Sequence, residues 1–170
     1  MKKFLKYSGI IAAILAIVAF ILMLACPAVR SGDDIVAKGT TVLFGKKETS
    51  TVLGVTFTGE TKLAWSALVG WIFVIVALII LLLGIILPLV KVTALEKFAG
   101  VLNLVAVVLL IVAGVFAFIS LSVFCTANGL DSVPEKWSLG AGWVIAGILA
   151  IVGGVVAILP AVVDLIGKKK

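Results

Sequence analysis

Histidine is absent from this sequence, and charged residues are scarce. Only 13% of the 170 residues are Asp, Glu, Lys or Arg, whereas a soluble domain carries about 25%. Without histidine the chain lacks the commonest metal ligand and general base. Because 64% of the residues are apolar, the few polar residues could not cover the surface of a soluble domain. These shortages exclude an ordinary soluble globular protein.

Groups that carry out chemistry in membranes are also missing. The two cysteines, Cys26 and Cys125, are far apart in sequence and form no CxxC pair, and no charged residue lies in the middle of an apolar run. Thiol oxidation and proton transfer within a membrane require such groups. We therefore expect no catalytic residue, no metal and no cofactor, and the sequence predicts a protein that is not an enzyme.

Four long apolar runs dominate what the sequence does contain. They cover residues 5–26, 65–90, 98–125 and 139–166, and a helix that crosses a membrane needs about 20 apolar residues. The segments 28–64 and 126–138 form two loops on one side, opposite a tight turn and both termini. The predicted fold is all-α, a single membrane domain over residues 1–170. Cleavage before Cys26, as in a lipoprotein, would leave three spans, but the long first run and Pro27 favour a retained helix.

Lysines at the ends of the runs predict the orientation. Eight of them lie on the side of the termini, at positions 2, 3, 6, 91, 97, 168, 169 and 170. With Glu96 and Asp164 they place the whole net charge of +6 on this side, because the charges of the two loops cancel. Basic residues favour the cytoplasmic side. We expect a multi-pass plasma-membrane protein with cytoplasmic termini, and lysines 168–170 that anchor the chain at lipid rather than bind nucleic acid.

The tryptophans are grouped at the starts of two runs. Trp65 and Trp71 begin the second run, and Trp137 and Trp143 begin the fourth. Indole side chains favour the interface between membrane and water. We therefore interpret all four as anchors at the outer surface of the membrane.

Small residues recur at helical spacing in every run. The stripes are Gly9, Ala12, Ala16, Ala19, Met23 and Cys26; Gly70, Ala77 and Gly84; Ala99, Asn103, Ala106, Leu110, Ala113, Ala117 and Ser120; and Gly147, Ala150, Gly154, Ala157 and Ala161. In lipid, close packing of small residues brings helices together. The simplest interpretation is a left-handed four-helix bundle closed on itself, with Asn103 as an interhelical polar contact. The alternative is that Gly153 and Gly154 dock a second protein.

The loop 28–64 predicts a β-hairpin. Residues 35–44 and 51–58 are rich in β-branched and aromatic residues, and the polar segment between them begins with Gly45. A lone hairpin is marginal in water, so we expect it to rest on the outer helix ends or on a short strand near residues 126–130. The apolar residues expected to contact a partner are Val42, Phe44, Leu53, Val55 and Phe57.

The two cysteines lie at the outer ends of the first and third runs, at similar depth. The outer compartment is oxidising, and a disulfide needs Cα atoms about 4.4–6.8 Å apart. The alternative is that both are free thiols packed in the bundle. The sequence favours a disulfide between Cys26 and Cys125.

The order of these features resembles the claudin-type tetraspan plan, with four spans, a large first outer loop and Trp65 near the second span. Claudins carry tryptophan and two cysteines in that loop, whereas residues 28–64 contain neither, so the resemblance implies architecture alone. The lysine-rich start, the segment 138–142 (SLGAG) and the lysine tail resemble small four-span membrane proteins of Gram-positive bacteria. That resemblance implies no particular activity.

These features lead to two functional hypotheses. The first is a non-enzymatic accessory, scaffold or immunity-type protein that binds a protein or peptide partner through its extracellular β-hairpin. The second is an oligomeric channel or transporter subunit, with Asn103 lining a pore between protomers. The expected partners are the lipid bilayer, a protein or peptide on the extracellular side and further copies of the chain.

Overall fold

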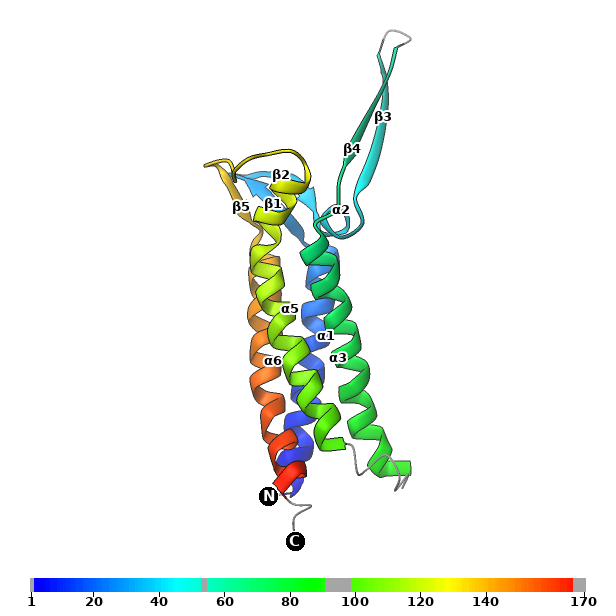
Figure 1. Cartoon of the computed structure of the whole chain (residues 1–170), viewed down its shortest axis with the longest axis vertical. Helices are drawn as coiled ribbons and strands as arrows, with labels where there is room; N and C mark the ends of the chain where they lie inside the picture. The colour runs from blue at the N-terminus through cyan, green and yellow to red at the C-terminus, as the bar shows by residue number, and fades with distance from the viewer. Residues whose placement is uncertain (1, 53–54, 91–98, 167–170) are drawn as a thin grey trace.

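Four long helices account for most of the chain in a computed structural model, which describes residues 2–52, 55–90 and 99–166 (Figure 1). They are α1 (Lys2–Ala25), α3 (Trp65–Val90), α5 (Ala99–Ala127) and α6 (Ala141–Ile166). By length and composition, each of the four could cross a membrane. The prediction of four long apolar helices is therefore confirmed. Leu53 and lysines 91, 97 and 168–170, for which the sequence predicts roles, lie outside the described residues.

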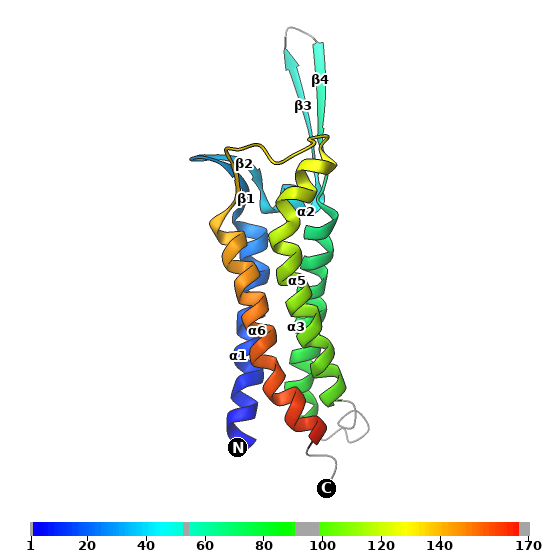
Figure 2. The same ribbon diagram turned by 60° about the vertical axis from the view of Figure 1, so that its left-hand side comes forward.

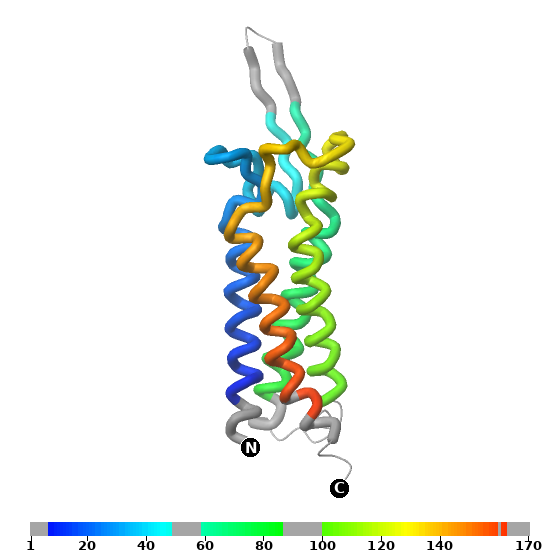
Figure 3. Tube along the Cα trace, turned by 90° about the vertical axis from the view of Figure 1, so that its left-hand side faces the viewer, coloured from blue at the N-terminus to red at the C-terminus, as the bar shows by residue number. Residues whose placement is uncertain are grey.

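Each long helix packs against two of the others. Both α1 and α5 contact α3 and α6, so α1 and α5 lie diagonally across the group. The start of α1 and the end of α6 lie at the same end of the molecule, opposite the strands (Figures 1 and 3). We call the opposite end, which carries the strands, the strand end.

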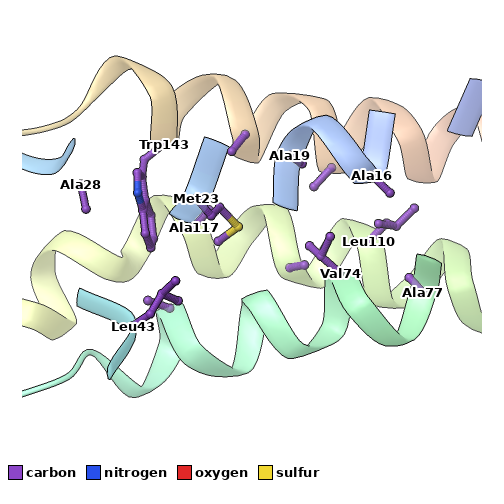
Figure 4. Close-up of a cluster of buried hydrophobic side chains, with 14 of the residues drawn as sticks. Ala16, Ala19, Met23, Ala28, Leu43, Val74, Ala77, Leu110, Ala117 and Trp143 are labelled. Carbon is purple, nitrogen blue, oxygen red and sulfur yellow. The ribbon is translucent and has the colours of Figure 1, made fainter. Parts of the chain in front are cut away.

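Most residues of the predicted stripes lie in the core between the helices (Figure 4). Gly9 is an exception, because an added Cβ there would meet no atom within 4 Å. Ala16 and Ala19 of α1 and Ala77 of α3 are fully buried. On α5 and α6 the backbones come so close that a Cβ added at Gly114 would lie 2.7 Å from the carbonyl oxygen of Gly147. Close approach of this kind is what small residues permit in membrane helices.

The alternative role predicted for Gly153 and Gly154 is wrong. Both glycines are buried inside the bundle. Gly153 faces Ala12 of α1, and Gly154 faces Val107 of α5. They are occupied by neighbouring helices of the same chain and cannot dock a second protein.

A three-stranded antiparallel sheet lies at the strand end. Its strands are β1 (Pro27–Ser31), β2 (Asp34–Lys38) and β5 (Trp137–Leu139), in the order β2-β1-β5. β1 directly follows α1 and β5 directly precedes α6, and because these two helices are neighbours their flanking segments can pair. The prediction of a strand near residues 126–130 is wrong, because α5 continues to Ala127 and a turn follows it.

The β-hairpin of the first loop is present, but its strands differ from the predicted ones. They are β3 (Lys46–Val52) and β4 (Val55–Thr61), so the polar segment predicted as the turn is part of a strand. Residues 39–44, predicted as strand, form the short helix α2 (Gly39–Phe44). Tertiary packing overrides the local preference for strand, since Val42 and Leu43 are buried and α2 contacts both α1 and α3.

Candidate functional site

The base of the hairpin is hydrogen-bonded to the neighbouring helix and loop. Gly45 has a φ of 73°, and its N–H donates a hydrogen bond of 2.8 Å to the carbonyl of Thr41. On the other side of the base, the N–H of Ala64 donates to the carbonyl of Val42 over 2.8 Å. Both ends of the hairpin are therefore tied to α2, which is itself packed on α1 and α3.

Asn128 adds a third tie from the second loop. Its Oδ1 accepts a hydrogen bond of 2.8 Å from the N–H of Lys62, and its Nδ2 donates to the carbonyl of Lys62 over 3.1 Å. Nδ2 also donates to the carbonyl of Phe124 over 2.8 Å. Sequence reasoning missed this residue, although an asparagine before Gly129 (φ 81°) at the end of a long helix is a signal of a helix terminus.

Substituting Asn128 with alanine is expected to loosen the hairpin base. The change removes both hydrogen bonds to Lys62, each worth about 1 kcal/mol, and leaves the carbonyl of Phe124 without that donor. Hydrogen–deuterium exchange should show faster exchange in residues 60–64. Asp131→Ala, an exposed change in the same loop, is the control, and equal exchange in the two variants would contradict a clamping role for Asn128.

Charged side chains of the hairpin lie near its base. Lys47 and Glu60, which are paired in the register, approach to 3.6 Å, and Lys46 pairs with Glu48 along β3. The hydrogen bond from Lys46 and its positive charge hold the pKa of Glu48 below its usual value. The stability contributed by the Lys46–Glu48 pair is therefore present at pH values above the usual pKa of a glutamate. It is lost as the pH falls through the lowered pKa of Glu48. Exposed pairs contribute little, so the backbone ladder mainly sets the register.

The outer half of the hairpin, residues 49–59, contains no charged residue and no proline. Its pairing is regular, with Thr49 opposite Thr58 and Thr51 opposite Thr56, and without the register shifts seen between β1 and β2. Within the described parts of the chain, neither edge pairs with another strand. β3 and β4 pack on each other and project away from the helices (Figures 1 and 2). The expectation that the hairpin rests on the helix ends or on a further strand is therefore wrong.

The residues predicted to contact a partner fall into four groups. Val42 is 1% exposed and belongs to the core, so the prediction for it is wrong. Phe44 is exposed, and its ring makes an edge contact with Trp71 at 5.5 Å between ring centroids. Val55 and Phe57 lie in β4, opposite Val52 and Ser50. Leu53 lies outside the described residues.

The four tryptophans do not share one environment. Trp65 is 55% exposed at the start of α3, whereas Trp71 and Trp137 are partly buried. Trp143 is fully buried and points into the bundle toward Leu43 (Figure 4). The prediction of Trp143 as an interfacial anchor is therefore wrong, because the first turn of α6 lies under the sheet and turns this side chain inward.

Both cysteines are free thiols, so the predicted disulfide is wrong. Cys26 directly follows α1 and lies against α6, where a Cβ at Gly142 would be 2.3 Å from the Cys26 Cβ. Cys125 is 1% exposed on α5. Similar depth does not bring them together, because α1 and α5 are diagonal.

Asn103 lies in the interior, as expected for a contact between helices. It is 7% exposed, and a Cβ at Gly84 of α3 would lie 2.8 Å from its Oδ1. Gly84 thus leaves room for the carboxamide between α5 and α3.

The outer half of the hairpin is therefore the candidate site. It presents backbone donors and acceptors on two open edges, and α2 and Asn128 hold its base. An arrangement of this kind can accept a further strand. No protein-family model matches this chain, and no curated protein matches it.

Proposed function

We propose that this chain is a non-enzymatic, multi-pass plasma-membrane protein that binds a protein or peptide by strand addition to residues 49–59. In this role it acts as an accessory, scaffold or immunity-type protein. The four apolar helices cross the membrane as a left-handed bundle, and the hairpin stands on the extracellular side. Further copies of the chain are additional candidate partners.

One observation carries this proposal: the outer half of the hairpin has two unprotected edges. Natural edge strands are usually shielded by charges, proline, bulges or a covering element. Residues 49–59 have neither charge nor proline, their register is regular, and β3 and β4 project away from the helices. An uncharged segment rich in threonine and valine is also prone to pair with other strands. A binding function explains why such an edge is kept open.

The membrane placement is supported by charge and composition. The four candidate spans have mean hydropathies of 2.5–3.2, and lysines at positions 2, 3 and 6 lie at the end opposite the hairpin. Basic residues favour the cytoplasmic side, which supports a strand end outside the cell. The four-span plan of claudins and of small four-span proteins of Gram-positive bacteria has the same orientation. The resemblance to these proteins stays a prediction.

The alternative function, an oligomeric channel or transporter subunit, has less support. A pore between protomers lined by Asn103 would require this side chain at the outside of the bundle. Asn103 is 7% exposed and lies against Gly84. We therefore favour strand addition over conduction.

Photo-crosslinking in intact cells tests the proposal. A photoreactive residue at Ser50 is expected to give one major product with a partner protein. The double variant Thr51→Lys/Thr56→Glu places opposite charges on a register pair, which preserves the hairpin but protects its edges. We expect at least tenfold less product from this variant.

The charge-swapped variant Lys47→Glu/Glu60→Lys is the control, because it retains a cross-strand pair at the base. It should crosslink like the unmodified protein. The proposal fails if the edge charges leave the product yield unchanged, or if a photoreactive residue at Asp131 gives the same product in equal yield.

A further inference from the structure

Two adjoining hollows lie where the hairpin meets the helices. The upper one, of about 560 Å³, lies between the hairpin base and the end of α5, and the lower one, of about 290 Å³, lies between α3 and α5. Ala127 lines both. Figure 2 shows α3 and α5 side by side beneath the hairpin. The two hollows therefore adjoin at Ala127, one at the strand end and the other on the side of the bundle.

The upper hollow is lined by both basic and apolar residues, and we call its lysines the basic rim. Lys46, Lys47 and Lys62 line it together with Phe44 and Leu63, and Glu60 is the acidic residue of the lining. Lys46 and Lys47 are paired with glutamates. Within the described residues, no carboxylate lies at ion-pairing distance from Lys62. The rim therefore keeps an excess positive charge that favours an anionic group.

Lys62 differs from the other two lysines in being tied to the second loop. Its backbone N–H and carbonyl are both held by Asn128, and its side chain is exposed. A fixed backbone limits where the ammonium group can lie. The side chain of Lys62 therefore starts from a fixed point of the backbone, next to the exposed Leu63.

The lower hollow is lined mainly by apolar groups. Trp65, Val123 and Thr126 line it, and the Trp65 ring lies against Phe116 with 5.8 Å between ring centroids. The hydroxyl of Thr126 donates a hydrogen bond to the carbonyl of Ser122 within α5, so this polar group already has an acceptor. This hollow lies along the candidate span Gly100–Ala127 and would face the acyl chains.

We propose that the two hollows bind one phospholipid, with its phosphate beside Lys62 and an acyl chain beside Trp65. The lysines of the upper hollow match the charge of the headgroup, and the mainly apolar lower hollow matches a hydrocarbon chain. Trp65 at the start of α3 places the junction between the hollows at the depth of the membrane interface. The proposal uses the membrane placement but does not depend on a strand partner, so the two proposals can fail separately.

Fluorescence quenching in vesicles tests the lipid site. The full-length protein is reconstituted in phosphatidylcholine vesicles with a small fraction of phosphatidylglycerol brominated on its acyl chains. Because bromine quenches nearby tryptophan, brominated phosphatidylglycerol should quench the fluorescence more than an equal fraction of brominated phosphatidylcholine. This quenching should be weaker in Trp65→Phe. Lys62→Gln should weaken the preference for phosphatidylglycerol about fivefold, the effect of one cation near a lipid surface.

Lys136→Gln is the matched control, because Lys136 is an exposed lysine of the second loop that does not line the upper hollow. This variant should keep the preference for phosphatidylglycerol. Equal effects of the two lysine substitutions, or no lipid preference in the unmodified protein, would overturn the proposal. It is also overturned if excess inorganic phosphate relieves the quenching, which would indicate a site for free phosphate, or if Trp65→Phe leaves the quenching unchanged.

Discussion

Replacing Gly140 with alanine is expected to lower the free energy of unfolding by about 3 kcal/mol or more. A Cβ at this position would lie 2.0 Å from the carbonyl oxygen of Pro27. The clash cannot be relieved by a side-chain rotation, since the atom it meets belongs to the backbone. The N–H of Gly140 also donates to the carbonyl of Ala28 over 2.8 Å, so moving the chains apart breaks a hydrogen bond between β1 and the start of α6.

Gly9→Ala is the matched control for this prediction. Gly9 lies in α1 with no atom within 4 Å of an added Cβ, and alanine favours a helix over glycine by about 1 kcal/mol. Thermal unfolding followed by circular dichroism in detergent should show a large loss of stability for Gly140→Ala and none for Gly9→Ala. Similar melting of the two variants would contradict the close contact between β1 and α6.

Truncating Trp143 to alanine is expected to cost about 3–5 kcal/mol of stability. The side chain is fully buried beneath the sheet, so its removal leaves a cavity that neighbouring backbone cannot fill. Trp143→Phe should be milder, because Nε1 has no hydrogen-bond partner in the described structure and phenylalanine keeps most of the packing. Equilibrium unfolding in a denaturing detergent gives the comparison.

Comparing Trp65→Ala with Trp143→Ala distinguishes an interfacial tryptophan from one in the core. Trp65 is 55% exposed, so its truncation is expected to cost about 1 kcal/mol or less. If Trp65→Ala were more destabilising than Trp143→Ala, the assignment of Trp143 to the core would be wrong. The pair thus tests which tryptophan lies inside the bundle.

The sequence alone determined the long helices and the residues that pack between them. Both features depend on local order along the chain: an apolar run of sufficient length predicts a span, and a period near 3.5 places Ala12, Ala16 and Ala19 on one buried face. The existence of a hairpin in the first loop followed from β-branched residues in the same way. These signals do not require knowledge of which helix lies beside which.

Tertiary structure decided everything that depends on neighbours in space. β5 pairs with β1 because α1 and α6, the helices next to these strands, are adjacent. The two cysteines stay apart because α1 and α5 are diagonal. Val42 lies in a helix rather than a strand because α1 and α3 bury it. Helix adjacency is set by contacts between residues distant in sequence, which neither hydropathy nor periodicity within one segment encodes. For the same reason the tie from Asn128 to the hairpin base became visible only in the folded chain.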